Sequence, residues 1–446
     1  MNSAAAAGSP AEQDRVIAIV PLDAVEESFF IPAGAEDLPE VAAIIDEVRR
    51  RGDRALKDCC LRYDGIVPEH FRVSRESLDE ALAGMAAETR ISLTAAVENI
   101  RCFARRQFET FRGFELEIAP GVRAEQRITP LDRVGVYVPG GNFPLVSSLL
   151  MGVIPAQVAG VTQIVVCTPP DRQATVPSVI RATAALIGVE EVYALGGVQA
   201  IAAMAFGTES IRPVDKIVGP GNRFVTAAKK AVYGRVGIDF VAGPSEVMII
   251  ADASADPTFV AADLLAQAEH DTAAVAVLVT DAPQLALRVE TEIRRRLETL
   301  STITIARRAL AQNGMIIIVN SMDQAVEVAN RKAPEHLELQ VNDPEAMTRK
   351  LKNYGSLFVG AYSAEVLGDY SSGINHVLPT GGAARFSGGL GVKDFIKIQT
   401  ILRATPEGMS RIGPAAAAIA TLEGLDAHRQ AVEVRGQRKQ SGEKGN

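Results

Sequence analysis

Gln267 and His270 stand three residues apart in the stretch LLAQAEHD (264–271), and both side chains can supply a metal ligand. On an α-helix this spacing places them on one face, one turn apart. Histidine is the most common metal ligand among side chains, whereas a glutamine carbonyl is a weak, hard oxygen donor. By itself the pair is either half of a metal site with an unusual ligand or a polar spot on an ordinary helix, because short motifs often occur by chance.

The chain has only five histidines, and four of them lie near other groups that are useful for chemistry. These four, each with its neighbour, are His270 after Gln267, His336 after Glu335 in KAPEHLELQV, His376 after Asp369 in GDYSSGINHVLPT, and His428 after Glu423 in LEGLDAHRQAV. His70, in PEHFRV, has no such neighbour, and we expect it to be a surface or capping residue.

Each pairing also has a purely structural interpretation. Asp369 follows Gly368 and suits a turn, Glu335 suits a surface ion pair, and His428 suits the exposed face of a last helix. If the groups instead converge, two nitrogens and two oxygens from Gln267, His270, Asp369 and His428 would suit zinc or a related divalent ion. The adjacent acid and imidazole of Glu335 and His336 would then remain free for proton transfer.

The elements that must position these residues change in character along the chain. Residues 36–110 carry apolar residues at three-to-four spacing, which predicts helices. From Arg133, short β-branched runs alternate with helical segments, and the alternation continues after SEVMIIAD (245–252). This pattern predicts two α/β units with mostly parallel sheets and a ligand cleft between them.

Two glycine-rich turns, VYVPGGN (136–142) and VGPGN (218–222), follow expected strands. Either they let the backbone approach a ligand closely, or they are simply tight turns between strand and helix. No GxGxxG follows a strand, so the usual dinucleotide fingerprint is absent.

Composition excludes several classes of function. The 446 residues are 47% apolar and 22% charged, with a net charge of −8 and no long basic block, so nucleic acid is not the expected partner. Cys59, Cys60, Cys102 and Cys167 show no CxxC spacing or secreted disulfide pattern, which indicates a reducing cytoplasm. The apolar stretch 145–167 is interrupted by polar residues and proline, so we expect a buried helix and strand rather than a membrane span.

Long motifs in order along residues 36–434 make the chain resemble the histidinol dehydrogenase family. They are RVGVYVPGG, GGVQAIAAMAFGTESI, VDKIVGPGNRFVTAAKK, IDFVAGPSEVMIIAD, LLAQAEHD, PEHLELQ, GDYSSGINHVLPT and EGLDAHRQAV. The resemblance implies oxidation of L-histidinol to L-histidine through L-histidinal with two NAD, the last steps of histidine biosynthesis.

The resemblance also implies roles for individual residues. It makes Gln267, His270, Asp369 and His428 the ligands of one zinc ion per subunit, and Glu335 and His336 the acid–base pair. Substrate-binding positions would be Ser245, His336, His376 and Glu423 together with the four zinc ligands. Tyr137, Gln199 and Asn222 match the positions that hold NAD, which explains the missing fingerprint. The family is a homodimer whose C-terminal segment crosses over, so Glu423 and His428 would serve the partner's active site.

For the fold, the resemblance implies two incomplete Rossmann-like domains with parallel-sheet cores and small terminal extensions. We expect a leader and small N-terminal segment (1–35), a discontinuous first domain (36–135 with 245–390), a second domain (136–244), a dimer-crossover segment (391–434) and a disordered tail (435–446).

Three other functions stay open at this stage. A relative on the same scaffold could oxidise another polar alcohol, such as a sulfonated diol. A zinc hydrolase could use Glu335 to activate water and would need no NAD. A catalytically silent ligand-binding protein is disfavoured by the intact Glu335–His336 pair.

Overall fold

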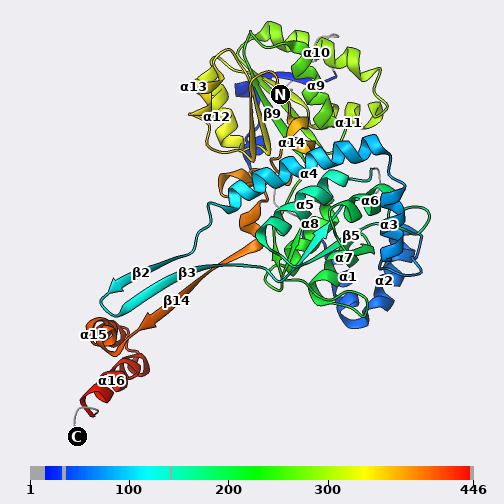
Figure 1. Ribbon diagram of the computed structural model, residues 1–446. Coiled ribbons are helices and arrows are strands. Elements are labelled where there is room, and N and C mark those ends of the chain that lie inside the picture. Colours follow the sequence, from blue (N-terminus) through cyan, green and yellow to red (C-terminus); the bar gives the residue numbers. More distant parts are fainter. Residues whose placement is uncertain (1–15, 33–36, 141–142, 442–446) are drawn as a thin grey trace, which may run out of the picture.

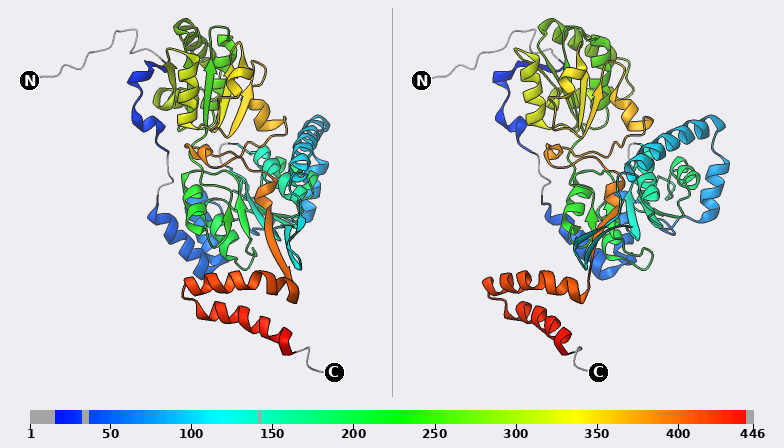
Figure 2. Two further views of the ribbon diagram at one scale, coloured as in Figure 1. Left: turned by 90° about the vertical axis from the view of Figure 1, so that its left-hand side faces the viewer. Right: turned by 60° about the vertical axis from the view of Figure 1, so that its left-hand side comes forward.

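The computed structural model describes residues 16–32, 37–140 and 143–441, without the side chains of 437–441. Two α/β units, each built on a parallel sheet, lie one above the other, and a long arm extends from the lower unit (Figures 1 and 2). The expected α/β architecture with parallel-sheet cores is therefore confirmed.

The lower unit holds a five-stranded parallel sheet in the order β6-β5-β4-β7-β8. Its strands are β4 (Arg133–Tyr137), β5 (Gln163–Thr168), β6 (Glu191–Ala194), β7 (Lys216–Val218) and β8 (Gly237–Ile238). Its helices are α5 (Val146–Ala159), α6 (Ser178–Leu186), α7 (Gly197–Phe206) and α8 (Arg223–Val232). The strand order reverses between β4 and β7, and in open α/β sheets ligands bind beside the carboxyl ends of the strands at such a point.

The apolar stretch 145–167 forms α5 and β5, both largely buried in this unit, as the sequence predicts. Across the described ranges, none of the helices combines the length and the apolar composition that crossing a membrane requires.

The upper unit holds a six-stranded parallel sheet in the order β1-β11-β10-β9-β12-β13. Its strands are β1 (Ala18–Pro21), β9 (Glu246–Ala251), β10 (Val275–Thr280), β11 (Met315–Ile318), β12 (His336–Gln340) and β13 (Ser356–Val359). Its helices are α9 (Pro257–Ala268), α10 (Pro283–Leu297), α11 (Ile303–Asn313), α12 (Met322–Lys332), α13 (Pro344–Thr348) and α14 (Glu365–Tyr370). Every residue of β9 and β12 is buried, because helices cover both faces of the sheet.

Part of the expected N-terminal leader belongs to this sheet. β1 pairs in parallel with β11, and Ile17 and Phe30 are buried in the cores of the same unit. The separate N-terminal segment expected over residues 1–35 therefore needs correction, because its described part, from Ile17 to Phe30, packs into the upper unit.

The expected grouping of residues 36–135 with 245–390 is wrong. The helices of this segment, α1 (Pro39–Arg51), α2 (Asp53–Cys59), α3 (Arg75–Ala83) and α4 (Ala87–Phe108), pack on the helices of the lower unit instead. Val41, Val48 and Leu56 join the core around α7, and Ile100 joins the core around α5. Residues 377–395 also return to the lower core, where Phe395 is fully buried. Helical periodicity predicts an apolar face but not which surface covers it.

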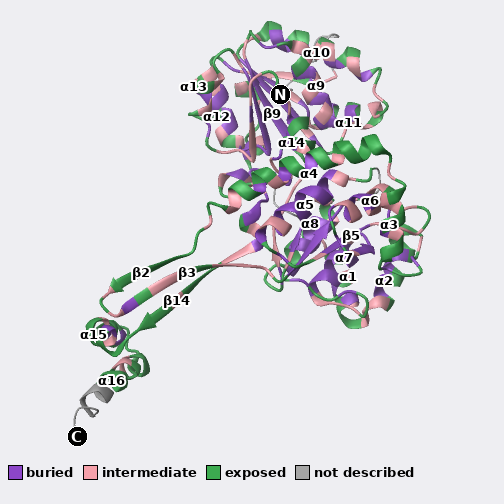
Figure 3. Ribbon diagram, in the orientation of Figure 1, coloured by how far each residue is buried: buried purple, intermediate pink, exposed green. Residues whose placement is uncertain are grey.

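The arm is a three-stranded antiparallel sheet that ends in two helices (Figures 1 and 3). It consists of β2 (Phe114–Ala119), β3 (Val122–Pro130), β14 (Ile396–Ala404), α15 (Pro406–Leu422) and α16 (Asp426–Ser441). α15 packs on α16 and on the arm strands β2 and β14, and both helices are mostly exposed. Because α16 continues to Ser441, the disorder expected from residue 435 is wrong up to that point, and residues 442–446 lie outside the described part.

Candidate active site

Glu335 and His336 lie at the amino edge of the six-stranded sheet. His336 is the first residue of β12, and Glu246 is the first residue of the neighbouring strand β9. α9 follows β9 and runs back across the sheet, so its carboxyl end brings Gln267 and His270 to this same edge. Asp369 lies in α14, which contacts α9. The fold thus gathers at one edge several residues that are far apart in the sequence.

The imidazole of His336 is held in one tautomer. Its Nδ1 lies 3.1 Å from Oε1 of Glu365 and 3.3 Å from the carbonyl oxygen of Glu246. A backbone carbonyl can only accept, so Nδ1 carries the hydrogen and Nε2 is the basic nitrogen. Nε2 has no hydrogen-bond partner among the described residues and lies 3.7 Å from Oδ1 of Asp369. Burial lowers the pKa of His336 to about 3, which keeps the imidazole neutral and leaves Nε2 unprotonated.

Glu335 is fixed beside this imidazole by the start of β9. Its Oε2 accepts a hydrogen bond from the backbone nitrogen of Glu246 at 2.9 Å and lies 3.8 Å from Nδ1 of His336. Burial raises the pKa of Glu335 well above its usual value. The Glu246 side chain is itself held, because it pairs with Nζ of Lys332 at 3.1 Å and accepts from the nitrogen of Gly381 at 2.9 Å. Glu335 is therefore a buried, well-positioned acid–base group.

The expected metal ligands of this chain lie close by. Gln267 is 1% exposed, and neither atom of its amide has a hydrogen-bond partner in the described part of the chain. A buried amide without partners is costly, and a cation bound to its oxygen would remove part of that cost. Nε2 of His270 lies 4.0 Å from Oδ2 of Asp369, whose pKa burial raises to about 6. An amide oxygen, an imidazole and a carboxylate are donor types that a metal ion accepts, so the chemistry of these three residues is compatible with the expected site.

A second set of possible ligands shares one member with the first. One atom each of His336, Glu365 and Asp369 lie within 4.8 Å of one another. Asp369 can therefore serve a metal either with Gln267 and His270 or with His336 and Glu365. The second set would engage the basic nitrogen or the hydrogen-bonded nitrogen of His336, whereas the first leaves that imidazole free.

His376 joins this cluster to the lower unit. Its Nδ1 donates to the carbonyl oxygen of Asp369 at 2.9 Å, and its Nε2 lies 3.4 Å from Oγ of Ser148 in the first turn of α5. Burial lowers the pKa of His376 to about 4, so this imidazole is neutral. α5 begins beside the carboxyl end of β4. The contact between Ser148 and His376 therefore brings the carboxyl edge of the lower sheet close to the amino edge of the upper sheet. Ser245 is exposed at the same upper edge, directly before β9.

The three expected cofactor positions lie at the carboxyl edge of the lower sheet. Tyr137 ends β4, and its hydroxyl accepts from the nitrogen of Gly197 at 3.1 Å. Gln199 is 2% exposed in the first turn of α7, and Asn222 caps α8 by accepting from two backbone nitrogens at 3.1 Å. Tyr137 and Asn222 flank the strands between which the order reverses, where a dinucleotide is expected.

Comparison with known proteins matches residues 34–436 to the family model described as histidinol dehydrogenase. The chain belongs to the histidinol dehydrogenase family. It is 47% identical over 398 residues to histidinol dehydrogenase of Methanothermobacter thermautotrophicus, covering 89% of this chain and 93% of the relative. It is 48% identical over 397 residues to that of Rhizobium meliloti, covering 89% and 91%. The crystal structure of histidinol dehydrogenase from Elizabethkingia anophelis aligns with a TM-score of 0.89 and 38% identity, covering 96% of this chain and 99% of that one. The family predicted from the motifs is confirmed.

Two residues that the family motifs place at the site lie elsewhere in this single chain. Glu423 and His428 are both exposed, at the end of α15 and the start of α16 in the arm (Figure 1). No hydrogen bond or ion pair joins either residue to the buried cluster among the described residues. Their expected roles in binding metal and substrate stay predictions.

Glu365 and Glu246, which hold His336 and Glu335, are not among the residues predicted from the sequence. Glu365 stands four residues before Asp369, the spacing that places two side chains on one helix face, so the criterion used for Gln267 and His270 would have found it. Glu246 begins an otherwise apolar strand, which is an unusual place for a buried carboxylate.

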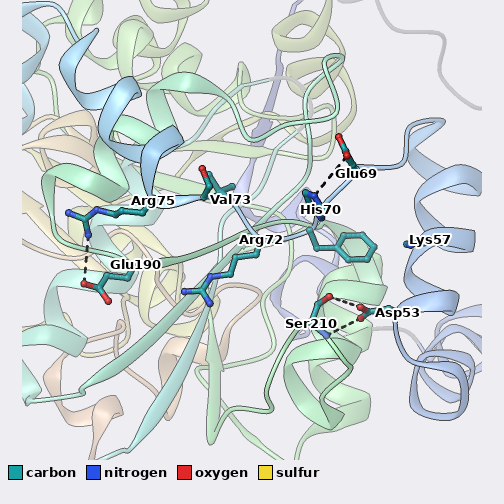
Figure 4. Close-up of a pocket in the computed structure, with 11 residues that line it drawn as sticks. Asp53, Lys57, Glu69, His70, Arg72, Val73, Arg75, Glu190 and Ser210 are labelled. Carbon is teal, nitrogen blue, oxygen red and sulfur yellow. Dashed lines mark hydrogen bonds and ion pairs between the residues drawn. The ribbon is translucent and has the colours of Figure 1, made fainter.

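A surface cleft elsewhere on the molecule contains none of these residues. It has a volume of about 840 Å³ and lies on the lower unit between α2 and the extended segment 69–75 (Figure 4). Asp53 bonds to Ser210 on one side, and Arg75 lies 3.7 Å from Glu190 on the other. His70 lines this cleft with its ring exposed, as expected for a surface residue.

Proposed function

We propose that this chain oxidises L-histidinol to L-histidine through L-histidinal, using two NAD, in the last steps of histidine biosynthesis. The observation that carries the proposal is the neutral imidazole of His336, with a free basic Nε2, beside Glu335 and the unpartnered amide of Gln267. A base for the alcohol proton, an acid–base group for water and a metal ligand thus occur together in a member of the histidinol dehydrogenase family.

Gln267, His270 and Asp369 would hold one zinc ion per subunit, with His428 as the fourth ligand. The carbonyl oxygen of Gln267, one imidazole and one carboxylate are a suitable donor set for zinc. When bound, zinc supplies a positive centre that anchors the amine and imidazole of the substrate. The proposed substrate-binding set is completed by His376, Glu423 and Ser245.

The proton steps follow from the geometry of His336 and Glu335. Nε2 of His336 takes the hydroxyl proton while the carbinol carbon gives a hydride to NAD, which yields the aldehyde. Glu335 takes a proton from the water that adds to the aldehyde. Nε2 then accepts the proton of the hydrate as a second hydride passes to a second NAD. In the overall reaction, one alcohol, one water and two NAD are converted to one carboxylate, two NADH and three protons.

NAD would bind at Tyr137, Gln199 and Asn222. These positions lie at the edge of the lower sheet that the Ser148–His376 contact brings to the base. A cleft closed between the two units would also protect the aldehyde from bulk water.

The working form we propose is a homodimer whose active sites are shared. Ile419 and Leu422 are exposed on α15 and Leu425 in the turn that follows it, and Val366, Leu367 and Tyr370 are exposed on α14 beside the cluster. In a dimer, the apolar surface of the arm of one copy would be buried against the apolar surface of α14 of the other copy. An arm docked over α14 of the partner would carry Glu423 and His428 to the other cluster.

We also place the enzyme in the cytoplasm. The four cysteines are free thiols, three of them buried, which suits a reducing compartment.

The test is a count of NADH formed per L-histidinol consumed, before and after removal of metal with a chelator. We expect two NADH per histidinol, loss of the reaction without metal, and its return with zinc. Turnover of a sulfonated diol but not of histidinol would instead support the related alcohol dehydrogenase. Hydrolysis without NAD binding would support the zinc hydrolase, and full histidinol oxidation by metal-free protein would contradict the metal assignment.

A further inference from the structure

A buried ion pair lies beneath one of the glycine-rich turns. Lys229 of α8 is 2% exposed and pairs with Asp239, whose side chain is 1% exposed directly after β8. The nitrogen of Gly219 donates to Oδ2 of Asp239 at 2.8 Å, and Nζ of Lys229 donates to the carbonyl oxygen of Gly219 at 2.8 Å. The two charged side chains therefore hold both backbone polar groups of the same glycine.

Gly219 begins the turn 219–222 that connects β7 to Asn222, the cap of α8. Its φ is +118°, a conformation that side chains rarely allow, and a Cβ there would collide with the carbonyl oxygen of Tyr137. The turn is thus pressed against the end of β4 from one side and held by the ion pair from the other. Two of the three expected cofactor positions at this edge, Tyr137 and Asn222, depend on where Gly219 lies.

Stability alone does not account for the pair. Taking a lysine and an aspartate out of water is costly, and well-packed apolar residues often serve a core equally well. Here the charges have a specific effect, because together with the nitrogen of Phe240, which donates to Oδ1 of Asp239 at 2.8 Å, they fix three backbone groups in one place. A fixed turn presents its backbone and Asn222 to a ligand without an ordering cost at the time of binding.

We infer that Lys229 and Asp239 are positioning residues for the dinucleotide, which set the affinity for NAD by holding the turn 219–222 in its binding conformation. This inference rests on the proposed NAD-dependent function. Neither residue needs to touch the cofactor, since they act through Gly219 and Asn222.

The test is the double variant Lys229→Met/Asp239→Asn in the full-length, zinc-loaded protein. Both charges are removed with little change of volume, and the asparagine oxygen can still accept from the backbone. We expect the KM for NAD to rise about tenfold, equivalent to the loss of one hydrogen bond to a charged group. kcat at saturating NAD and the KM for histidinol should change by less than about twofold, because the chemical groups are unaltered. Calorimetric titration with NAD should give the same loss of affinity.

The matched control is Arg133→Met/Glu191→Gln, an ion pair of 2.7 Å at the opposite, amino edge of the same sheet. It should lower stability and leave the KM for NAD unchanged. An equal rise in KM in the control would show that general loosening of the unit is responsible and would overturn the inference. So would a folded Lys229→Met/Asp239→Asn protein with the original KM. If that double variant does not fold, Asp239→Asn alone replaces it, with the same two outcomes.

The proposed function has a separate readout. If the unaltered protein neither binds NAD nor forms NADH from histidinol, the proposed function fails. If the unaltered protein binds NAD and forms NADH from histidinol, but the KM for NAD in the variants differs from the values expected, only the positioning role is contradicted.

Discussion

Oε1 of Glu365 lies 3.1 Å from Nδ1 of His336, and both side chains are about 95% buried or more. Burial, followed by the charge of Asp369, raises the pKa of Glu365 well above its usual value. The carbonyl of a protonated carboxyl group still accepts from Nδ1, so Glu365 together with the backbone of Glu246 keeps the basic Nε2 turned toward Asp369. The base is therefore oriented by a residue from a different element, α14.

Glu365→Ala should lower kcat for histidinol about 10- to 100-fold, because the imidazole loses a partner that orients it. Glu365→Gln should lose much less, since its amide oxygen can still accept the hydrogen bond. The KM for NAD should be the same in both variants. Single-turnover formation of NADH measures the effect, and equal losses in the two variants would show that hydrogen-bond acceptance is not the function of Glu365.

His336→Asn and Glu335→Gln should affect different steps. His336→Asn should suppress hydride transfer from histidinol at neutral pH, because Nε2 is the proposed base. Glu335→Gln should slow the aldehyde step more, because its proposed task is to activate water. Rates measured separately with histidinol and with histidinal test this division, which is wrong if each variant slows both steps equally.

Two inactive variants should complement each other if the arm crosses over. His270→Ala and His428→Ala chains, unfolded and refolded together, would form mixed dimers in which one site has both histidines and the other has neither. Random pairing makes half of the dimers mixed, so about a quarter of the original activity should return. If each His428 served its own chain, every site would keep one defect. No recovery, with mixed dimers demonstrated by mass, would therefore exclude the crossover.

The Arg133–Glu191 pair should stabilise the lower unit in a pH-dependent way. Hydrogen bonding to Arg133 lowers the pKa of Glu191 below its usual 4.5. A carboxylate with a depressed pKa stabilises the fold fully above its unfolded value, and this contribution is lost as the pH falls through the folded pKa. Glu191→Gln should cost about 2 kcal/mol at pH 7, with the difference narrowing below pH 4.5. Urea unfolding at several pH values measures it, and a difference independent of pH would contradict the assignment.

The sequence by itself determined the types of residue and their local arrangement. The alternation of strands and helices predicted the α/β units. The helix predicted around Gln267 is α9, but it ends at Ala268, so His270 follows the helix and does not share its face. The long motifs predicted the family. Such features depend on neighbours within one or two turns or on a single strand, so they can be read from a local stretch of chain.

Only the tertiary structure decided which surfaces meet. The apolar faces of α1 to α4 could pack on either unit, and they pack on the helices of the lower one. β1 could have been a leader, and it joins the upper sheet. The sequence likewise did not place Glu365 against His336, or Lys229 and Asp239 around Gly219, because these contacts join elements separated by many residues. They arise from packing between whole elements, whose shapes are set by many side chains at once.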